Sequence, residues 1–382
     1  MDTMLAAALS AAHTIIPFLI VLSVVVFVHE FGHFWVARRC GVKIETFSIG
    51  FGPEIFGWND KRGTHWRVAW LPLGGYVKMF GDADPSSFGT SEGAAQMTDV
   101  DKKIAFFSQP VRKRFAIVAA GPASNYLFAV VVLAGLFLVN GQPYTATTVA
   151  SVVEGSVAAT AGLLPKDKVL SIDGSAMNSF EDIRRTVSLN AGTPMRIVFE
   201  RDGKTMDVTA TPEVLTTIDR LGMEHKQGRL GIVSTENAFR KLGPIAAIRE
   251  SGVEIWNITA GTLQGVGQMI IGVRGAEELG GPLRIAEMSG KVAKDGIFAL
   301  FWFIVVISVN LGLINLFPIP LLDGGHLMFY GIEALRGRPL SDRVQEYGAR
   351  LGAGLVLSLM LFATWNDLVH LRVVSYLRDL IS

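Results

Sequence analysis

The sequence predicts a polytopic α-helical membrane protein with about four transmembrane helices, a membrane-associated β-hairpin loop and an inserted α+β domain. Three observations support this fold class: the composition, four long apolar stretches, and a turn-rich polar region between the second and third of them. Apolar residues make up 50% of the 382 residues and charged residues only 18%. Soluble domains carry about 25% charged residues, so the deficit indicates a membrane protein.

The four apolar stretches are candidate membrane spans at residues 15–36, 115–139, 297–317 and 351–365. The first three reach the ~20 apolar residues that a span needs, and the fourth is shorter. The first stretch is longer than the about 7–15-residue core of a signal peptide, and no basic segment precedes it. We therefore expect it to be an uncleaved span.

The basic residues predict the orientation. Lys and Arg are concentrated between the first and second stretches and between the third and fourth, whereas residues 1–14 contain neither. By the positive-inside rule both basic loops are cytoplasmic, and the N-terminus, residues from about 140 to 296 and the C-terminus lie outside. The net charge of +1 argues against a nucleic-acid partner, and the single Cys40 excludes an intrachain disulfide.

Strands are predicted in the first cytoplasmic loop. Residues 47–53 and 66–79 form apolar runs rich in aromatic and β-branched residues, bounded by Gly and Pro. At membrane depth such strands must be buried in protein or line a wet cavity. An ordinary soluble hairpin is the alternative interpretation.

The external region predicts a compact β domain with one helix at residues 145–212. Residues 161–174 give a turn, a strand and a turn, residues 180–187 have helical spacing, and residues 201–204 carry a hairpin signal. Beyond this domain, residues 244–275 predict an amphipathic helix on the outer membrane surface.

The strongest chemical signal is His29-Glu30-Phe31-Gly32-His33. On a helix the two histidines share a face and can bind one metal ion, while Glu30 can take a proton from a metal-activated water. The motif lies in an apolar helix, where polar side chains are costly unless they have a function. The alternative is a helix end just outside the bilayer with solvated polar residues.

A third ligand must come from elsewhere, because catalytic zinc usually has three protein ligands. Asp323 follows the third apolar stretch at its predicted cytoplasmic end, at a depth similar to that of the histidines. Pro318 and Pro320 break the helix before it. From spacing alone Asp323 is equally suited to cap the next helix, and His326 is a rival ligand.

These motifs resemble the site-2 protease family of intramembrane zinc metalloproteases. The resemblance rests on His29-Glu30-Phe31-Gly32-His33 together with Leu322-Asp323-Gly324. Residues 71–79, 121–125 and 315–320 are similar to the bacterial regulator-of-sigma-E-protease branch of that family. The similarity covers nearly the whole chain and keeps the order of the motifs.

The resemblance implies roles for individual residues. His29, His33 and Asp323 correspond to the Zn²⁺ ligands and Glu30 to the general base. Asn315 corresponds to an asparagine that engages substrate near the zinc, and its amide is suited to bond an oxyanion or a substrate backbone. A structural role for Asn315 at the broken helix ends is the alternative. Asn125, in a small-residue stretch of the second span, is instead interpreted as a residue that packs helices together.

Substrate binding is also predicted at the strand-like loop. A substrate helix must unwind to expose its backbone, and the loop at Gly74, Gly75 and Tyr76 is predicted to hold the unwound segment by edge pairing.

The external domain resembles a PDZ domain through residues 161–163 and 172–174. Such domains bind peptide ends at a sheet edge, and a spacer or size filter is the alternative role. Well-known members of the branch carry two PDZ domains in tandem, whereas one is found here. The predicted organisation has four parts: an N-terminal membrane part at 1–139, the periplasmic PDZ domain at 140–213, an external linker with an amphipathic segment at 214–296, and a C-terminal membrane part at 297–382.

The expected function is an intramembrane zinc endopeptidase of regulated intramembrane proteolysis, in a bacterial inner membrane with its active site toward the cytoplasm. The resemblance implies single-pass membrane proteins as substrates, such as anti-sigma factors already trimmed outside, and also remnant signal peptides. The lipid bilayer is the surrounding partner, and the sequence leaves the oligomeric state open. A membrane-anchored peptide-binding adaptor is the rival function and a transporter a weaker one; Glu30 favours the enzyme, because an adaptor needs no base.

Overall fold

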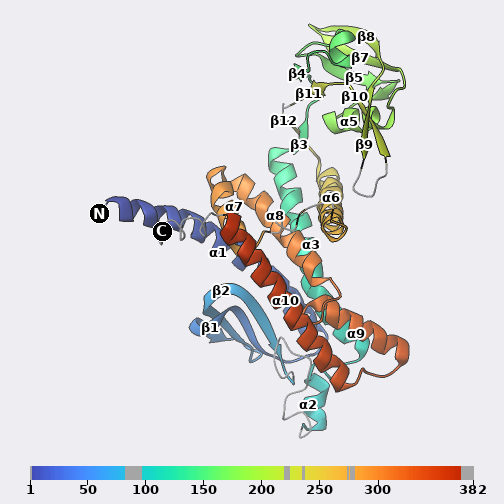
Figure 1. Ribbon diagram of the computed structural model, residues 1–382. Coiled ribbons are helices and arrows are strands. Elements are labelled where there is room, and N and C mark those ends of the chain that lie inside the picture. Colours follow the sequence, from blue (N-terminus) through green and yellow to red (C-terminus); the bar gives the residue numbers. More distant parts are fainter. Residues whose placement is uncertain are drawn as a thin grey trace, which may run out of the picture. The chain divides into compact units, whose positions relative to one another are not determined.

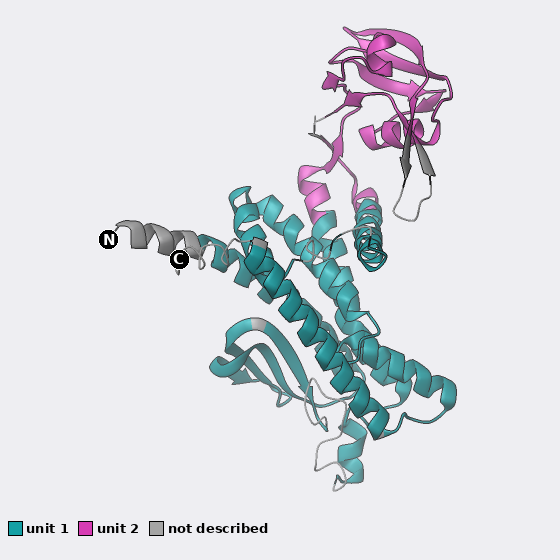
Figure 2. Cartoon of the chain, in the orientation of Figure 1, with its two compact units in different colours: residues 1–134, 248–382 teal, residues 135–247 magenta. Residues whose placement is uncertain are grey.

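The chain divides into two units in the computed structural model, which describes residues 2–81, 97–218, 224–234, 237–272, 275 and 280–370. Unit 1 comprises Met1–Ala134 and Ile248–Ser382, and unit 2 comprises Gly135–Ala247 (Figure 2). Unit 2 is therefore an insertion between two halves of unit 1.

Among the described residues, four helices are long and apolar enough to cross a membrane. They are α1 (Asp2–Arg39), α3 (Val111–Asn140), α8 (Ile297–Asn315) and α10 (Asp342–His370) (Figure 1). The candidate spans within α1 and α10 are His13–Arg39 and Arg343–Val369. Each of the four predicted apolar stretches lies in one of these helices, except that α8 ends two residues before the predicted end, where the chain turns toward Pro318.

Helix α7 (Pro282–Lys294) packs against α1 and α8 inside unit 1. Ile285 and Val292 of α7 contact a buried cluster formed by Val21 and Val25 of α1 with Phe303 of α8. The sequence predicted an external linker over residues 214–296, and α7 is the part of that segment that packs inside unit 1. The apolar positions of α7 are too few to stand out in sequence, because polar residues separate them.

The N-terminus of α7 is capped by a carboxylate from α10. The Asp367 side chain is buried and accepts hydrogen bonds from the backbone amides of Gly281, Leu283 and Arg284 at 2.8, 2.9 and 3.1 Å. The first amides of a helix have no partner within the helix, and a carboxylate there is favoured by the helix dipole. This cap ties α10 to α7.

Strands β1 (Ile44–Asn59) and β2 (His65–Met79) lie where the sequence predicted them. Both strands bend, so that β1 contacts two separate parts of β2. Ser48 of β1 pairs with Tyr76 on one side and with Arg67 on the other. The aromatic rings of Phe34 in α1, Phe47 in β1 and Trp66 in β2 pack edge to face or tilted, 4.4–5.4 Å between centroids. This packing holds the sheet against the C-terminal end of α1.

A polar contact secures the β1–β2 turn to α1. Arg38 pairs with Asp60, and the Trp66 indole also donates to Asp60. Burial acts to raise the pKa of Asp60, but hydrogen bonds from Trp66, Arg38 and the backbone outweigh it and lower the pKa to about 2. The carboxylate is therefore ionised at neutral pH and remains paired with Arg38.

Two short helices complete unit 1 at this end, α2 (Asp99–Ile104) and α9 (Asp323–Arg336). Arg114 of α3 bonds Glu333 of α9 at 2.6 Å, and its guanidinium lies 4.8 Å from the ring centroid of Tyr330. Both members of the ion pair are largely buried. The pair fixes the helix that carries Asp323 against α3.

Unit 2 contains a four-stranded antiparallel sheet in the order β6-β5-β7-β8. Its strands are β5 (Lys168–Ile172), β6 (Ser175–Ala176), β7 (Met195–Arg201) and β8 (Lys204–Ala210), and its helices are α4 (Val157–Thr160) and α5 (Phe180–Leu189). Leu163, Ile183 and Phe199 lie in its core. The hairpin predicted at 201–204 is confirmed, and Asp202 and Gly203 have the positive φ values, 50° and 77°, that a tight hairpin turn requires.

Unit 2 continues past the boundary that the sequence predicted at residue 213. Strand β11 (Ile232–Val233) pairs with β4 (Ser151–Val152), and β12 (Asn237–Arg240) pairs with β3 (Gln142–Thr145). In the sequence, a hairpin of β9 (Glu213–Ile218) and β10 (Glu224–Arg229) lies between β8 and β11. The returning strands β11 and β12 have only two and four residues, too few to show periodicity in the sequence. Residues 219–223, 235–236, 273–274 and 276–279 of the predicted linker lie outside the described residues.

The predicted amphipathic helix at 244–275 corresponds to α6 (Pro244–Ile270). Within unit 1, Thr262 of α6 donates to the Asn310 side chain of α8 at 2.9 Å. The helix also places Thr259 3.4 Å from the Tyr126 hydroxyl of α3.

Candidate metal centre

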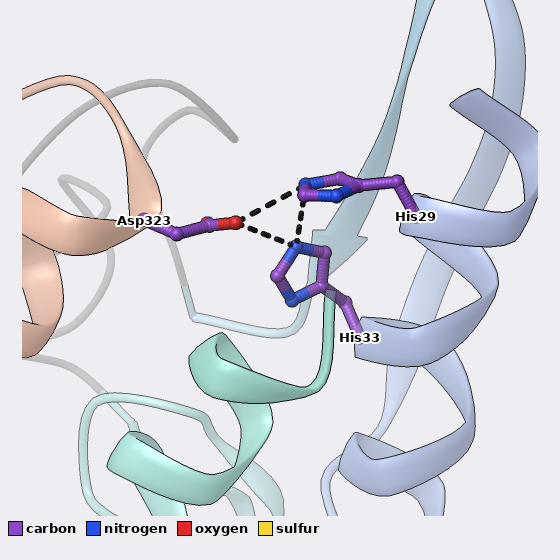
Figure 3. Close-up of side chains that lie close together, drawn as sticks. All are labelled: His29, His33 and Asp323. Carbon is purple, nitrogen blue, oxygen red and sulfur yellow. Dashed lines mark hydrogen bonds and ion pairs between the residues drawn. The ribbon is translucent and has the colours of Figure 1, made fainter. Parts of the chain in front are cut away.

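Helix α1 presents the two histidines of the sequence motif on one face. His29 and His33 are one turn apart and only 7% and 8% exposed. Their Nε2 atoms lie 3.3 Å from each other (Figure 3). This is the arrangement that an i, i+4 pair on a helix was expected to give.

Asp323, the first residue of α9, faces both imidazoles. Its Oδ2 atom lies 3.1 Å from His29 Nε2 and 3.4 Å from His33 Nε2 (Figure 3). That oxygen is buried and has no hydrogen-bond partner. The N-cap position of α9 is occupied by Leu322, so the capping role considered for Asp323 does not apply.

These three side chains fit a zinc ion. One ligand atom from each lies within 4.8 Å of the others. In the part of the chain that the structure describes, no other group of three His, Cys, Asp or Glu residues has this geometry. Two imidazoles and one carboxylate are the ligand types of catalytic zinc, which keeps a fourth position for water or substrate. The partnerless Asp323 Oδ2 is the buried acceptor that a cation would satisfy.

His326, the rival ligand, is not part of this group. Burial lowers the pKa of His326 to about 4, although the nearby Asp323 acts in the opposite direction. Its imidazole is therefore neutral at pH 7. The geometry favours Asp323 as the third ligand.

The backbone before α9 explains why glycine follows Asp323. Leu321 has a φ of +97°, which turns the chain sharply before the helix begins. A Cβ atom on Gly324 would lie 2.2 Å from the Phe317 carbonyl oxygen and 2.4 Å from that of Leu316. The start of α9 therefore packs directly on the end of α8, which brings Asp323 to the histidines.

Helix α3 supports the ligands from the other side. His33 Nδ1 donates to the Ile117 carbonyl oxygen at 2.9 Å, which leaves Nε2 facing Asp323 and His29. A Cβ atom on Gly121 would lie 2.2 Å from His33 Nε2 and 3.0 Å from His29 Cε1. The contact with Ile117 could not be predicted, since a backbone carbonyl leaves no residue-type signal in the sequence. Gly121 was singled out only as part of a stretch that resembles the family.

We expect Gly121→Ala to weaken zinc binding by about tenfold or more, the range seen when support of a metal ligand is disturbed. The added methyl collides with the His33 ring at the atom that faces the metal site. Chelator competition on the purified protein measures the effect. Gly135→Ala is the matched control in the same helix, since no atom lies within 4 Å of its Cβ position. Equal zinc affinity in both variants would contradict the proposed role of Gly121.

Glu30 follows His29 and points toward β2. A Cβ atom on Gly75 would lie 3.0 Å from Glu30 Cγ and 3.0 Å from Val26 Cγ1. The absence of a side chain at Gly75 thus lets β2 approach α1 beside Glu30. Gly75, predicted to bind substrate, and Glu30, predicted to be the general base, therefore lie side by side.

The remaining predicted site residues lie at the edges of this region. Gly74 precedes Gly75 in β2, and a Cβ atom on it would lie 2.4 Å from the Phe51 ring. Tyr76 is partly buried and stacks on Phe51, 6.2 Å between centroids. Asn315 is the last residue of α8 and partly buried, next to Leu316, whose carbonyl packs against the start of α9. None of these three belongs to the metal-ligand group itself.

Two buried histidines and one partly buried aspartate, with a glutamate adjacent to the first ligand, define a zinc hydrolase by their chemistry. The family comparison agrees: the sequence model described as "Peptidase family M50" matches residues 17–359. The chain belongs to peptidase family M50 and is a zinc metalloprotease.

Relatives along the full length have matching names. A protein of Agrobacterium fabrum named "Putative zinc metalloprotease" is 44% identical over 97% of this chain and 100% of its own length. A protein of Caulobacter vibrioides named "Metalloprotease MmpA" is 38% identical over 96% of this chain and 98% of its own length. The predicted family is therefore confirmed, and the adaptor and transporter alternatives are not supported.

Among solved structures, the PDZ domain of an SdrC-like protein from Listeria monocytogenes matches with a TM-score of 0.19 and 22% identity. The match covers 24% of this chain and 90% of that domain. A TM-score this low does not establish a shared fold, and unit 2 is defined by its own strands and helices.

Proposed function

We propose that this zinc metalloprotease is an intramembrane endopeptidase that cleaves transmembrane segments of single-pass membrane proteins. One observation carries the proposal: His29, Glu30 and His33 lie within the candidate span His13–Arg39, and the partly buried carboxylate of Asp323 lies against the two histidines. A helix rises about 1.5 Å per residue, so His29 and His33 are roughly 14 and 8 Å from Arg38 at the basic end of the span. That depth is inside the hydrocarbon region of a bilayer about 30 Å thick.

The proposed mechanism assigns each polar side chain one role. His29, His33 and Asp323 hold the zinc, which supplies Lewis-acid polarisation and an activated water when bound. Glu30 accepts a proton from the water that attacks the peptide carbonyl carbon. As the C–N bond breaks, Glu30 delivers that proton to the leaving amine. Asn315 is proposed to donate a hydrogen bond from its amide to the substrate backbone or the developing oxyanion.

The substrate must be extended at the site, because a helix hides its peptide carbonyls in its own hydrogen bonds. In the register of the described sheet, the β2 segment from Gly75 to Met79 pairs with β1 through residues such as Ile49 and Ser48. We propose that its other edge, beside Glu30, receives the unwound substrate as an added strand. Gly74, Gly75 and Tyr76 would then bind the substrate.

The substrate class proposed from the family resemblance is single-pass membrane proteins already trimmed outside the membrane. Anti-sigma-factor-like proteins are the main expected substrates, and remnant signal peptides are a second group. The protein would then act in regulated intramembrane proteolysis, as a multi-pass protein of a bacterial inner membrane. Its N-terminus and unit 2, proposed to be a PDZ domain, would be periplasmic, and its active site would lie toward the cytoplasm.

We expect a topology reporter fused after Arg338 to be active in the cytoplasm and one fused after Gly203 to be active outside. The basic residues of the two loops that join the candidate spans support this orientation, since basic loops are retained on the cytoplasmic side. Paired phosphatase and fluorescent-protein fusions measure it. The reverse pattern would falsify the orientation.

We expect deletion of residues 142–240 to spare zinc binding and to relax substrate selection. None of the proposed catalytic or ligand residues lies in unit 2. The backbone ends are adjacent, because Gln142 pairs with Arg240, so a short Gly/Ser bridge closes the gap. The deleted protein should cleave a short transmembrane substrate at the parental rate and also accept substrates with intact external domains.

The measurement compares trimmed and untrimmed versions of one substrate with the parent and the deleted protein. If the deleted protein is inserted and zinc-loaded yet cuts neither version, unit 2 is needed for catalysis and the selection role is wrong.

A further inference from the structure

Asn125 is buried beside the metal site on a helix that supplies no ligand. It lies in α3 with 0% of its surface exposed. Its Nδ2 atom is 3.4 Å from His29 Nδ1, and its Oδ1 atom is buried with no hydrogen-bond partner. A buried amide oxygen without a partner is costly, and it needs an explanation.

The ring of His29 decides how this amide must be oriented. His29 Nε2 faces Asp323 Oδ2 at 3.1 Å and His33 Nε2 at 3.3 Å, so Nε2 is the atom directed at the metal site. A neutral imidazole that ligates through Nε2 carries its proton on Nδ1. Nδ1 is then a donor, and an amide NH₂ group is the wrong partner for it.

A half-turn of the Asn125 amide gives His29 Nδ1 an acceptor and gives the buried amide oxygen a donor. The oxygen and nitrogen of an asparagine amide are nearly the same size, and their assignment follows from the hydrogen-bond network. After the half-turn, Oδ1 accepts the proton of His29 Nδ1, and Nδ2 takes the former place of the oxygen. His33 already shows the same pattern, because its Nδ1 donates to the Ile117 carbonyl oxygen of the same helix at 2.9 Å.

The backbone of Asn125 is itself fixed. The buried hydroxyl of Ser308 in α8 donates to the Asn125 carbonyl oxygen at 3.1 Å. Asn125 therefore joins the helix that carries His29 to the helix that precedes Asp323. A side chain anchored in this way is suited to hold an imidazole in one orientation.

We infer that Asn125 is a positioning residue that accepts a hydrogen bond from His29 Nδ1 and thereby fixes the tautomer and orientation of this zinc ligand. The inference rests on the proposed role of His29. This role replaces the interpretation of Asn125 as a residue that only packs helices together. Outer partners of this kind raise the basicity of a ligating histidine, and their loss typically weakens metal binding by about 10–100-fold.

Zinc affinity of the purified full-length protein in detergent, measured by chelator competition, tests the inference. Asn125→Leu keeps the size of the side chain but removes the acceptor, and should weaken zinc binding by about 10–100-fold. Asn125→Asp keeps an acceptor, and should stay within about threefold of the parent or bind more tightly. Asn310→Leu is the matched control: it removes a partly buried asparagine of α8 that bonds Thr262 and the Val306 carbonyl oxygen, and should leave zinc affinity unchanged.

Thermal unfolding of the metal-free proteins shows which variants fold. If Asn125→Leu does not fold, Asn125→Ala, which only removes atoms, takes its place with the same expected loss. Parental zinc affinity in the folded Leu or Ala variant would overturn the inference, and so would an equal loss in Asn125→Asp, which would indicate packing. A parent that binds no zinc would instead refute the proposed metal centre, so the two failures are distinguishable.

Discussion

Asp323→Ala, His29→Ala and His33→Ala are each expected to weaken zinc binding by at least about 100-fold, beyond the range typical of residues that only support a ligand. Each substitution removes one of three converging ligand atoms and leaves too few for a stable catalytic site. Metal analysis after dialysis, followed by chelator competition, measures the loss.

His326→Ala is the matched control, because this histidine is three residues from Asp323 on the same helix but outside the ligand group. It should retain zinc. Parental zinc content in Asp323→Ala together with loss of zinc in His326→Ala would exchange the roles of the two residues.

Glu30→Gln is expected to retain zinc and to lower the rate of peptide cleavage by about 10²–10⁴-fold, the usual contribution of a general acid–base group. Glutamine has the same shape but accepts no proton, and Glu30 is outside the ligand group. The measurement is the turnover rate on a transmembrane peptide in proteoliposomes at matched zinc content.

Glu45→Gln, the same chemical change on β1, is its control. Glu45 forms a half-exposed ion pair with Lys78, and such pairs contribute only about 0–1 kcal/mol. Unchanged turnover in Glu30→Gln would remove Glu30 from the mechanism.

Local patterns made the first half of the site predictable from sequence. His29 and His33 are four residues apart on a helix, so their common face follows from helix geometry alone. The position of Asp323 relative to the histidines does not follow from helix geometry, since 290 residues separate it from His33 in sequence. Charge topology placed the two at similar depth, and the resemblance selected Asp323 over His326. The 3.1–3.4 Å convergence needed the structure.

The supporting contacts could not be predicted for a physical reason: they depend on how helices pack. The bond from His33 to the Ile117 carbonyl, and the proximity of Asn125 to His29, join α1 and α3. No periodicity in either helix encodes these contacts. The Asp367 cap on α7 is a similar case, because a carboxylate of α10 satisfies amides about 85 residues away.

The fold shows the same division between local and distant information. Long apolar helices and the hairpin at 201–204 have strong local signals, and the structure contains them. Strands β11 and β12 consist of two and four residues, and they complete unit 2 only by pairing with strands 80 or more residues earlier. These strands therefore leave no periodic signal in the sequence, and the predicted domain boundary at residue 213 precedes them.

The most direct test of the central claim is mass spectrometry of membrane peptides from cells that express the parent or Glu30→Gln at equal levels. We expect peptide ends that appear only with the parent and that lie inside the apolar segment of single-pass membrane proteins, nearer its cytoplasmic side. Glu30-dependent ends found only in soluble domains or juxtamembrane loops would contradict an intramembrane active site.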